Sequence, residues 1–297
     1  MTTAEPSLEW QCDCELAMAP VWLPEAQALL LADPPSGRLL SYDPATGTGS
    51  AMTIGGRPSF ALPTADGQLL VGSERELLIV DRDGTLVRER RIDGPETNHT
   101  ADATVDAHGR LWFGMTGERG GTPAGGLFRY HDQRLIPLVF DVARPGGPAL
   151  TADARTLYHV DMAGRAIYRF AVTTAGSLSD GERFLGFSDD EGLPSSVTLD
   201  TEACLWVTMW EGGCVRRFSP EGALLATVVL PCLRVTGLAF GGADLTRAFV
   251  TTARSAQQQG DLGGSLFGFD VAVPGRAIPA VILGHGDLGL VDDDDHG

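Results

Sequence analysis

The sequence has few of the features that mark membrane, helical or secreted proteins. No stretch approaches the roughly 18 uninterrupted apolar residues of a membrane span. The N-terminus, MTTAEPSLEW, lacks the basic start and the apolar core of a signal peptide. No long segment repeats its apolar residues with the period of a helix. We therefore expect an all-β protein in the cytoplasm, without membrane contact.

Positive charge is also scarce. The chain of 297 residues has 22 Lys and Arg against 39 Asp and Glu, a formal net charge of −17. Such a chain repels other polyanions, which argues against nucleic acid and anionic membranes as partners. Part of the charge lies in the run Asp292–Asp295, which is typical of a solvated terminus. We predict one domain over residues 1–291 and an acidic C-terminal tail over residues 292–297.

The cysteines do not form a pattern of paired residues. There are five, an odd number, and no two have the Cys-x-x-Cys spacing: Cys12, Cys14, Cys204, Cys214 and Cys232. On a strand, Cys12 and Cys14 would share a face, but nothing in the sequence supplies the other ligands of a zinc site. We predict buried free thiols in a reducing compartment, and no cofactor.

What the sequence does contain is a degenerate repeat. Six segments each read as a short apolar strand, a turn and a second strand, with starts separated by 40, 42, 46, 48 and 43 residues. They begin at Leu29, Leu69, Leu111, Leu157, Leu205 and Ala248. Further short strands lie between them, giving about four strands per unit. This pattern predicts a six-bladed β-propeller with four-stranded antiparallel blades around a central channel. The segments Leu8–Cys14 and Ala277–Leu283 are expected to close the ring.

One position of the repeat is usually aromatic. The second residue of four of the six segments is Trp112, Tyr158, Trp206 or Phe249. Recurrence at one position of a repeat predicts packing between blades rather than a cage for a ligand.

Several segments resemble the senescence marker protein, gluconolactonase and luciferin-regenerating enzyme family. They include Pro20-Val21-Trp22, Tyr42–Gly47, Gly109–Gly114, Leu205-Trp206-Val207 and Val235–Gly242. The similarity covers nearly the whole chain. It implies the propeller fold and hydrolysis of sugar lactones or related esters, with one divalent metal at the top of the channel. In the family a Glu, an Asn and an Asp hold the metal, and an Arg-x-Asn-Asp segment helps to hold the substrate.

The chain departs from this family pattern at the metal ligands. Met18 stands at the position of the Glu, Gly146 at that of the Asn, and Ser195 at that of the Asp. A thioether, a glycine and a serine do not suit a hard dication. In the substrate segment His99 replaces the Arg and Ala101 replaces the Asn, whereas Asp102 remains. The resemblance therefore implies the fold and the place of the pocket, and we expect no bound metal.

The remaining channel residues predict a small-molecule pocket that is wider and more apolar than that of the family. Its candidate catalytic residues are His99, Asp102 and Ser195. Candidate substrate-binding residues are Met18, Arg57, Gly146, Ser196, Trp210 and Thr236. His99 and Asp102 could exchange protons with a substrate. Alternatively, His99 bonds a loop carbonyl and Asp102 caps a turn. No nucleophile-elbow motif surrounds Ser195.

Three functions are compatible with these observations. The first is an enzyme of the lactonase type that acts on a small, fairly apolar cyclic ester or related electrophile. It would use acid and base groups without a metal, for hydrolysis, isomerisation or cyclisation. The second is a pseudoenzyme that binds a ligand without turnover. The third is a protein-interaction propeller, for which the acidic surface is the only indication.

Overall fold

Strands make up nearly all the regular structure of the chain. The computed structural model describes residues 5–94, 96–119, 122–255 and 262–283. Within these ranges the only helical elements are two single 3₁₀ turns, Pro34–Ser36 and Asp189–Glu191. None of the helices there is long and apolar enough to cross a bilayer. The all-β prediction is confirmed.

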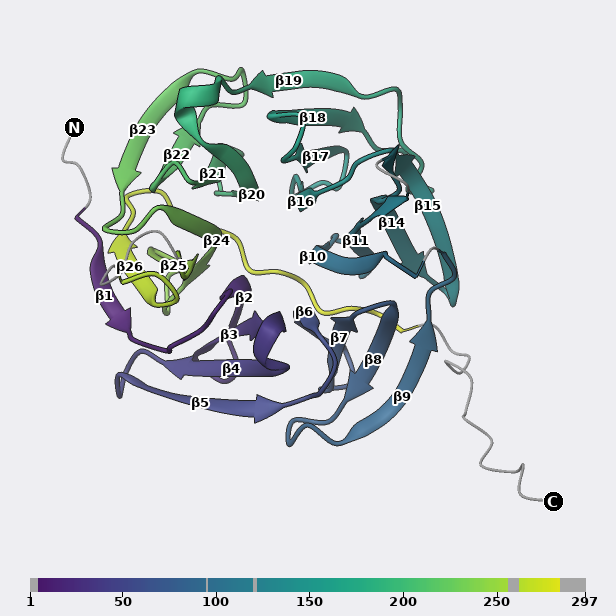
Figure 1. The fold of residues 1–297 in the computed structure, drawn as a ribbon, viewed down its shortest axis with the longest axis horizontal. Coiled ribbons are helices and arrows are strands. Elements are labelled where there is room, and N and C mark those ends of the chain that lie inside the picture. The colour runs from purple at the N-terminus through teal and green to yellow at the C-terminus, as the bar shows by residue number, and fades with distance from the viewer. Residues whose placement is uncertain (1–4, 95, 120–121, 256–261, 284–297) are drawn as a thin grey trace.

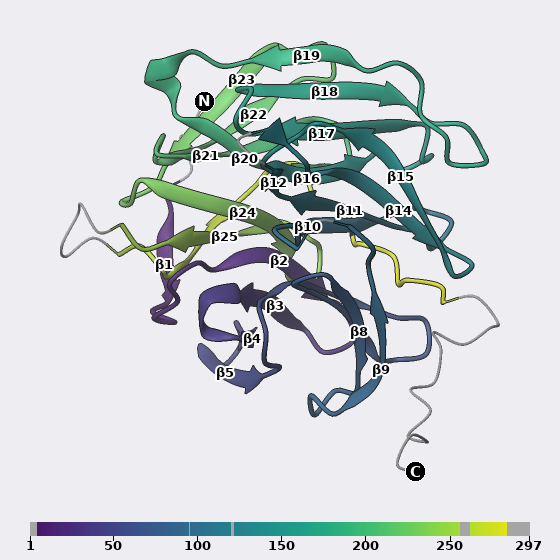
Figure 2. The same cartoon turned by 45° about the vertical axis from the view of Figure 1, so that its right-hand side comes forward.

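The strands form antiparallel sheets arranged as a ring, which Figure 1 shows face-on and Figure 2 at an angle. The first two sheets contain β2 (Met18–Leu23), β3 (Ala28–Asp33), β4 (Arg38–Asp43) and β5 (Thr48–Thr53), then β6 (Pro58–Pro63), β7 (Leu69–Ser73), β8 (Glu76–Val80) and β9 (Leu86–Arg91). The next two contain β10 (His99–Val105), β11 (Leu111–Thr116), β14 (Gly126–His131) and β15 (Arg134–Phe140), then β16 (Pro145–Leu150), β17 (Thr156–Asp161), β18 (Ala166–Ala171) and β19 (Glu182–Gly186). A two-stranded hairpin pairs β12 (Glu118–Arg119) with β13 (Thr122–Pro123).

The remaining eight strands form one continuous sheet. It contains β20 (Leu193–Leu199), β21 (Leu205–Trp210), β22 (Cys214–Phe218), β23 (Leu224–Val229), β24 (Arg234–Gly241), β25 (Arg247–Ala253), β26 (Leu266–Asp270) and β1 (Ser7–Trp10). The prediction of six separate four-stranded blades is corrected here, because four blades are separate sheets and the other strands share a fifth. The reason is local: Trp210 at the end of β21 pairs with Arg234 at the start of β24. The propeller architecture itself is confirmed.

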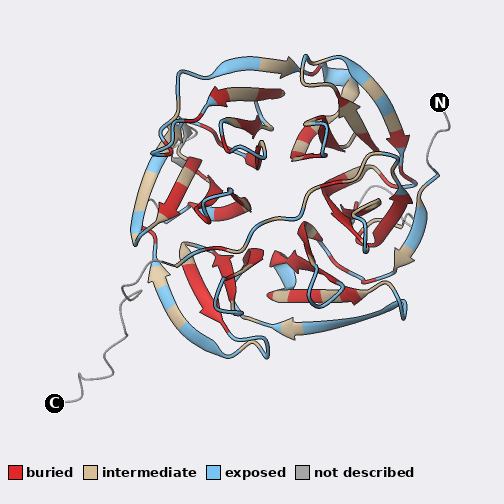
Figure 3. Ribbon diagram, turned by 180° about the vertical axis from the view of Figure 1, so that it is seen from behind, coloured by how far each residue is buried: buried red, intermediate tan, exposed pale blue. Residues whose placement is uncertain are grey.

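The two ends of the described chain take different roles. Strand β1 pairs with β26, so the N-terminal segment completes the last sheet as expected. Residues 277–283 were predicted to be a second closing strand, and this is wrong. The chain from Val271 to Leu283 instead crosses the middle of the ring, as the yellow segment of Figure 1 and the rear view of Figure 3 show. We call residues 271–283 the strap.

Backbone hydrogen bonds attach the strap at both sides of the ring. On one side Thr201 donates to the carbonyl of Pro274 at 2.9 Å, and on the other Ile282 donates to that of Gly109 at 2.9 Å. Thr201 and Gly109 follow the C-terminal ends of the inner strands β20 and β10. The strap therefore crosses the end of the channel at which the inner strands finish.

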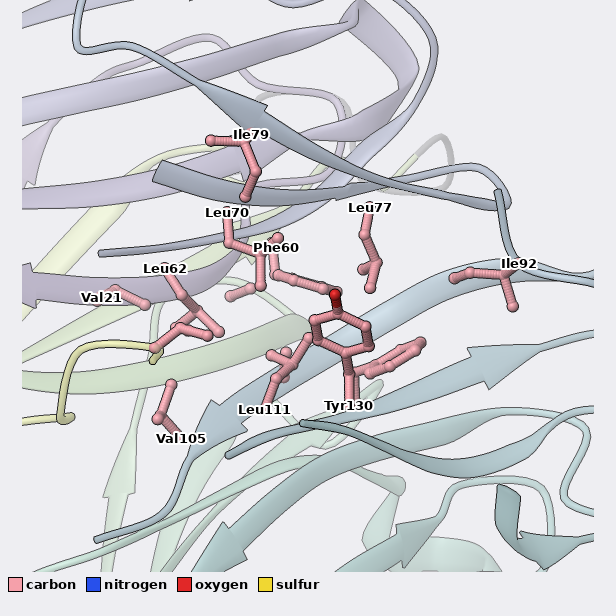
Figure 4. Packing of buried hydrophobic residues seen from close by; sticks show 14 of the residues in the cluster. Val21, Phe60, Leu62, Leu70, Leu77, Ile79, Ile92, Val105, Leu111 and Tyr130 are labelled. Atoms are coloured by element: carbon pink, nitrogen blue, oxygen red, sulfur yellow. The ribbon is translucent and has the colours of Figure 1, made fainter. Parts of the chain in front are cut away.

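Side chains from neighbouring blades form the core. Figure 4 shows one such cluster, in which Phe60 and Leu70 of one blade pack against Leu111 and Tyr130 of the next. Trp112, Tyr158, Trp206 and Phe249 are each at most 6% exposed and pack on the following blade, so the predicted role of this position is confirmed. A large apolar side chain fully buried in this way contributes about 1.5–3 kcal/mol.

Two of these tryptophans also bond a buried aspartate six residues earlier in the chain. The indole Nε1 of Trp112 donates to Asp106 at 2.8 Å, and that of Trp206 donates to Asp200 at 3.0 Å. Arginines neutralise both carboxylates: Arg110 contacts Asp106, and Arg217 contacts Asp200. Each pairing satisfies a buried polar group where the chain turns between two strands.

Candidate functional site

A cavity of about 70 Å³ lies in the central channel. Inner strands β2, β10, β16, β20 and β24 line it, and the strap contributes the stretch 276–279. Most of its lining residues are apolar, among them Val21, Leu150, Val197, Leu238 and Ile278, but polar atoms make up slightly more than half of its exposed lining. Its side chains with polar atoms are Asp102, Thr104, Ser196, Thr198 and Arg276. Apolar residues with a few polar groups are the usual lining of a small-molecule site, but this cavity is much smaller than the roughly 300–1,000 Å³ of typical ligand pockets.

Asp102 and Ser196 meet across the channel. The hydroxyl of Ser196, on β20, donates to Oδ2 of Asp102, on β10, at 2.6 Å. The amide of Ala103 donates to Oδ1 of Asp102 at 2.9 Å. The backbone of Gly147, on β16, also contributes a hydrogen bond to this carboxylate. Asp102 thus connects three inner strands while it lines the cavity.

The surroundings of Asp102 favour its protonated form. Burial is the largest effect and raises the pKa of Asp102 to about 6. The hydrogen bonds from Ser196 and from the backbone act in the opposite direction and hold the pKa down. A carboxyl group with this pKa changes its protonation state close to neutral pH, where a general acid or base is most effective.

Ser195 and Ser196 point to different sides of β20. The hydroxyl of Ser195 lies 2.8 Å from that of Thr208 and donates to the carbonyl of Val235 at 2.7 Å. The pairing of β20 with β21 is irregular between Pro194 and Ser196. The prediction that Ser195 is the reactive serine is corrected: its hydroxyl contacts strands β21 and β24, whereas that of Ser196 faces Asp102.

His99 and Asp102 are not brought together. His99 is exposed and lines a second pocket, of about 390 Å³, with Arg57 and Glu74. Partial loss of solvent around the ring in this pocket, and then the nearby charge of Arg57, lower the pKa of His99, against a backbone bond to Thr97 and the charge of Glu74. The predicted acid–base pair is therefore corrected. The pairing of β10 with β11 is irregular between Thr100 and Ala103. The side chains of His99 and Asp102 therefore do not follow the regular alternation of a strand.

Met18 and Gly146, which were predicted to stand at two of the family's metal-ligand positions, lie among packed neighbours. The side chain of Met18 packs against an apolar cluster that includes Leu30 and Leu39. Gly146 is buried, and a Cβ added to it would lie 1.9 Å from the carbonyl oxygen of Ser195. No side chain fits at this position without movement of the backbone. In the described ranges no three His, Cys, Asp or Glu side chains gather as they would around a metal ion.

Trp210 and Thr236 do not line the channel cavity either. The guanidinium of Arg234 lies over the ring of Trp210, 4.9 Å from its centroid. Thr236 is buried; its hydroxyl donates to the carbonyl of Ala17 and lies 2.9 Å from the hydroxyl of Thr251. Of the nine residues predicted for the site, only Asp102 and Ser196 line the channel cavity. Those two are the focus of the candidate site.

The strap also contributes to the cavity, although no sequence motif predicted it there. Arg276 lines the cavity, donates to the carbonyl of Leu150 at 3.1 Å, and has a pKa lowered by burial. Ile278 and Pro279 close the same side. The only available signal was the lack of a clear strand pattern around Pro274 and Gly275, which argued against a closing strand but did not indicate a crossing of the channel.

The fold places the chain in the class of all-β propellers. Residues 16–254 match the family model described as SMP-30/Gluconolactonase/LRE-like region, and the protein belongs to this family. Pentonolactonase XacC of Haloferax volcanii is 33% identical over 274 residues, which is 89% of this chain and 93% of that protein. A 6-deoxy-6-sulfogluconolactonase of Pseudomonas putida is 30% identical over 285 residues, which is 93% of this chain and 95% of that protein.

Solved structures support the same fold. A luciferin-regenerating enzyme superposes with a TM-score of 0.85 at 25% identity, over 94% of this chain and all of that one. A regucalcin from Agrobacterium tumefaciens, titled a calcium-binding protein, has a TM-score of 0.85 at 22% identity, over 94% of this chain and 97% of that chain. At that identity the second likeness concerns the fold alone.

Proposed function

We propose that this protein hydrolyses a small cyclic ester in its central channel, with Asp102 as the group that transfers the proton. The relatives named as lactonases support the reaction class. One observation supports the site: Asp102 lines the channel cavity, bonds Ser196 at 2.6 Å, and has a pKa raised to about 6. The substrate is a lactone small and apolar enough to lie among Val21, Leu150 and Leu238.

Asp102 acts as a base in the first step. Hydrolysis begins when water adds to the ester carbonyl, and ionised Asp102 accepts the proton that this water loses. The bond from the carbonyl carbon to the ring oxygen then breaks, and Asp102 returns the proton to that oxygen. The product is an open-chain hydroxy acid. Positioned acid–base groups of this kind contribute typically about 10²–10⁴-fold to a rate.

Ser196 positions the carboxylate. Its hydroxyl donates to Oδ2, which holds the carboxylate in one orientation and lowers the pKa of Asp102 relative to burial alone. Without this donor Asp102 would hold its proton to higher pH. We therefore assign Ser196 a positioning role and Asp102 the chemical role.

We further propose that the reaction does not use the metal of the family. The residues at the three ligand positions do not suit a hard dication. Met18 presents a thioether to an apolar cluster, and Gly146 has no room for a side chain. The hydroxyl of Ser195 is engaged by Thr208 and Val235. A cytoplasmic location stays a prediction from the sequence.

A lactone screen with defined variants tests both parts. Asp102→Asn should lower kcat by about 10²–10⁴-fold, and the control Asp141→Asn, at an exposed turn, should leave it unchanged. Turnover should persist after treatment with a chelator. Full activity of Asp102→Asn would remove the assignment of the base, and restoration of chelated enzyme by a divalent cation would remove the metal-free mechanism. Ligand binding in the channel without turnover would favour the pseudoenzyme instead.

A further inference from the structure

Cys12 and Cys14 form a buried pair of thiols at the closure of the ring. Their sulfurs lie 3.5 Å apart, and the two residues are 7% and 0% exposed. All five cysteines lie in the described part of the chain, buried and outside any disulfide. Cys12 and Cys14 are a pair of thiols in direct contact.

The backbone holds the two thiols together. Asp13, between them, has a φ of 55°, a left-handed conformation that is uncommon outside glycine and that bends the segment. The carbonyl of Gly264 accepts hydrogen bonds from the amide of Cys14 at 3.0 Å and from Sγ of Cys12 at 3.2 Å. Arg254 contacts the carboxylate of Asp13 at 3.1 Å. The pair is thus held by the segment that leads into β26 as well as by its own.

The contact between the thiols makes them unequal. The S–H of Cys14 donates to the sulfur of Cys12. This bond is the largest effect on Cys12 and lowers its pKa, whereas burial raises it. The same bond, together with burial, raises the pKa of Cys14. The bond from Sγ of Cys12 to the carbonyl of Gly264 exists only while Cys12 holds its proton. A cysteine of lowered pKa beside a second thiol that can resolve its oxidised form is one feature of redox-sensing cysteines.

We propose that Cys12 and Cys14 are a site of oxidation by hydroperoxides, at which Cys12 is the attacking thiol and Cys14 the resolving thiol, and that the product is a Cys12–Cys14 disulfide. The sulfurs must approach by about 1.5 Å to reach the length of a disulfide bond. Cys12 is the more exposed of the two residues, at 7% against 0%, which makes it the attacking thiol in this proposal. This site is independent of the reaction in the channel.

The chemistry balances in two steps. The thiolate of Cys12 attacks one oxygen of hydrogen peroxide, the O–O bond breaks, and Cys12 becomes a sulfenic acid while the second oxygen leaves as hydroxide and takes a proton to form water. The sulfur of Cys14 then attacks the sulfur of Cys12, and the S–O bond breaks. The departing hydroxide takes the proton of Cys14. One peroxide is reduced to two waters, and two thiols are oxidised to one disulfide, which a dithiol reductant reverses by exchange.

The disulfide would enclose only three residues. A loop this short restricts the unfolded chain much less than a long one. A disulfide here would therefore add little to the free energy of unfolding. We infer that the pair of thiols serves reversible oxidation instead of stability. Disulfides in a reducing compartment are usually transient and redox-sensing.

The test exposes the folded full-length protein to dilute hydrogen peroxide, quenches it, and alkylates it after unfolding. Peptide mass spectrometry should find Cys12 and Cys14 joined, with the loss of two hydrogen atoms, while Cys204 and Cys214 remain alkylated. Dithiothreitol should restore alkylation of the pair. In Cys14→Ser the sulfenic acid of Cys12 should persist long enough for a dimedone adduct to form, and in Cys12→Ser the oxidation of Cys14 should slow at least tenfold.

Two results would overturn the proposal. One is full alkylation of Cys12 and Cys14 at a peroxide dose that already oxidises Cys204 or Cys214. The other is oxidation of Cys14 in Cys12→Ser at the rate of the unsubstituted protein. The mapping on unsubstituted protein decides the first point even if a variant does not fold.

Discussion

The carboxylate of Asp102 and the hydroxyl of Ser196 lie 2.6 Å apart, although 94 positions separate the two residues in the chain. The contact exists because the inner strands β10, β16 and β20 converge on one channel, and β16 fills the space between the other two. The backbone of Gly147, on β16, also forms a hydrogen bond to the carboxylate of Asp102. Because the strands converge, Ser196 bonds the carboxylate of Asp102, and burial in the channel raises the pKa of that carboxylate.

The pair makes the rate depend on pH. Asp102 has to be ionised to accept a proton, so kcat/KM should rise as the pH passes about 6 and then level off. Ser196→Ala removes a hydrogen bond to the charged form, which should move this rise upward by about one pH unit. The measurement is a pH–rate profile of both proteins on the same lactone. Superimposable profiles would show that Ser196 does not act on Asp102.

Asp102 should also make stability depend on pH. Its pKa is about 6 in the folded protein and 3.8 for the unperturbed group. The folded state therefore holds this proton to higher pH, and the associated stability is full below pH 3.8 and is lost as the pH rises through 6. The loss is about 3 kcal/mol. In urea titrations between pH 4 and 8, unsubstituted protein should lose this much relative to Asp102→Asn, and a constant difference would contradict the prediction.

His159 should act with the opposite sign. It is 1% exposed, and its two ring nitrogens have no hydrogen-bond partner among the described residues. Burial lowers its pKa to about 4, from 6.5 for the free group. The folded protein keeps it neutral, so the stability is present above pH 6.5 and is lost as the pH falls through 4, by about 3 kcal/mol.

His159→Phe tests this, because it removes the titration and keeps a buried ring. The variant should lose less stability between pH 7 and 4 than the unsubstituted protein. His108→Asn, at an exposed position, is the control and should keep the original pH dependence. If His159→Phe and the unsubstituted protein lose the same stability between pH 7 and 4, groups other than His159 cause that loss.

Gly146 should tolerate no side chain. A Cβ at this residue would lie 1.9 Å from the carbonyl oxygen of Ser195, so β16 and β20 would have to separate. Overpacking of this kind costs typically about 1–3 kcal/mol, and Gly146→Ala should lower the free energy of unfolding by at least the upper part of that range. Thermal unfolding measures it. A variant with unchanged Tm would mean that the strands lie farther apart than described.

The buried Asp200 should matter far more than an exposed ion pair. It is fully buried and contacts Trp206 and Arg217, so Asp200→Ala should cost about 3–5 kcal/mol. The exposed pair of Arg82 and Glu25, 69% and 90% exposed at 3.7 Å, provides the contrast. Glu25→Ala should cost about 0–1 kcal/mol in the same denaturant titration. Similar costs for the two variants would contradict the role given to the buried aspartate.

Local sequence patterns predicted correctly those features that recur from blade to blade. The second position of the repeat correctly indicated Trp112 and Trp206 as contacts between blades, because apolar residues that recur in every blade meet the same neighbour each time. The closing role of β1 followed from its strand pattern. The number of separate sheets did not follow, because it depends on the single pairing of Trp210 with Arg234.

The sequence by itself determined the all-β propeller and the family. Only the tertiary structure decided which of two adjacent serines faces Asp102, that His99 lies in another pocket, and that the strap crosses the channel. The physical reason is that alternation along a strand is readable from the sequence only while the register is regular. The irregularities beside Thr100 and Ser196 change which side chains face the channel, and a single hydrogen bond between distant strands leaves no local signal.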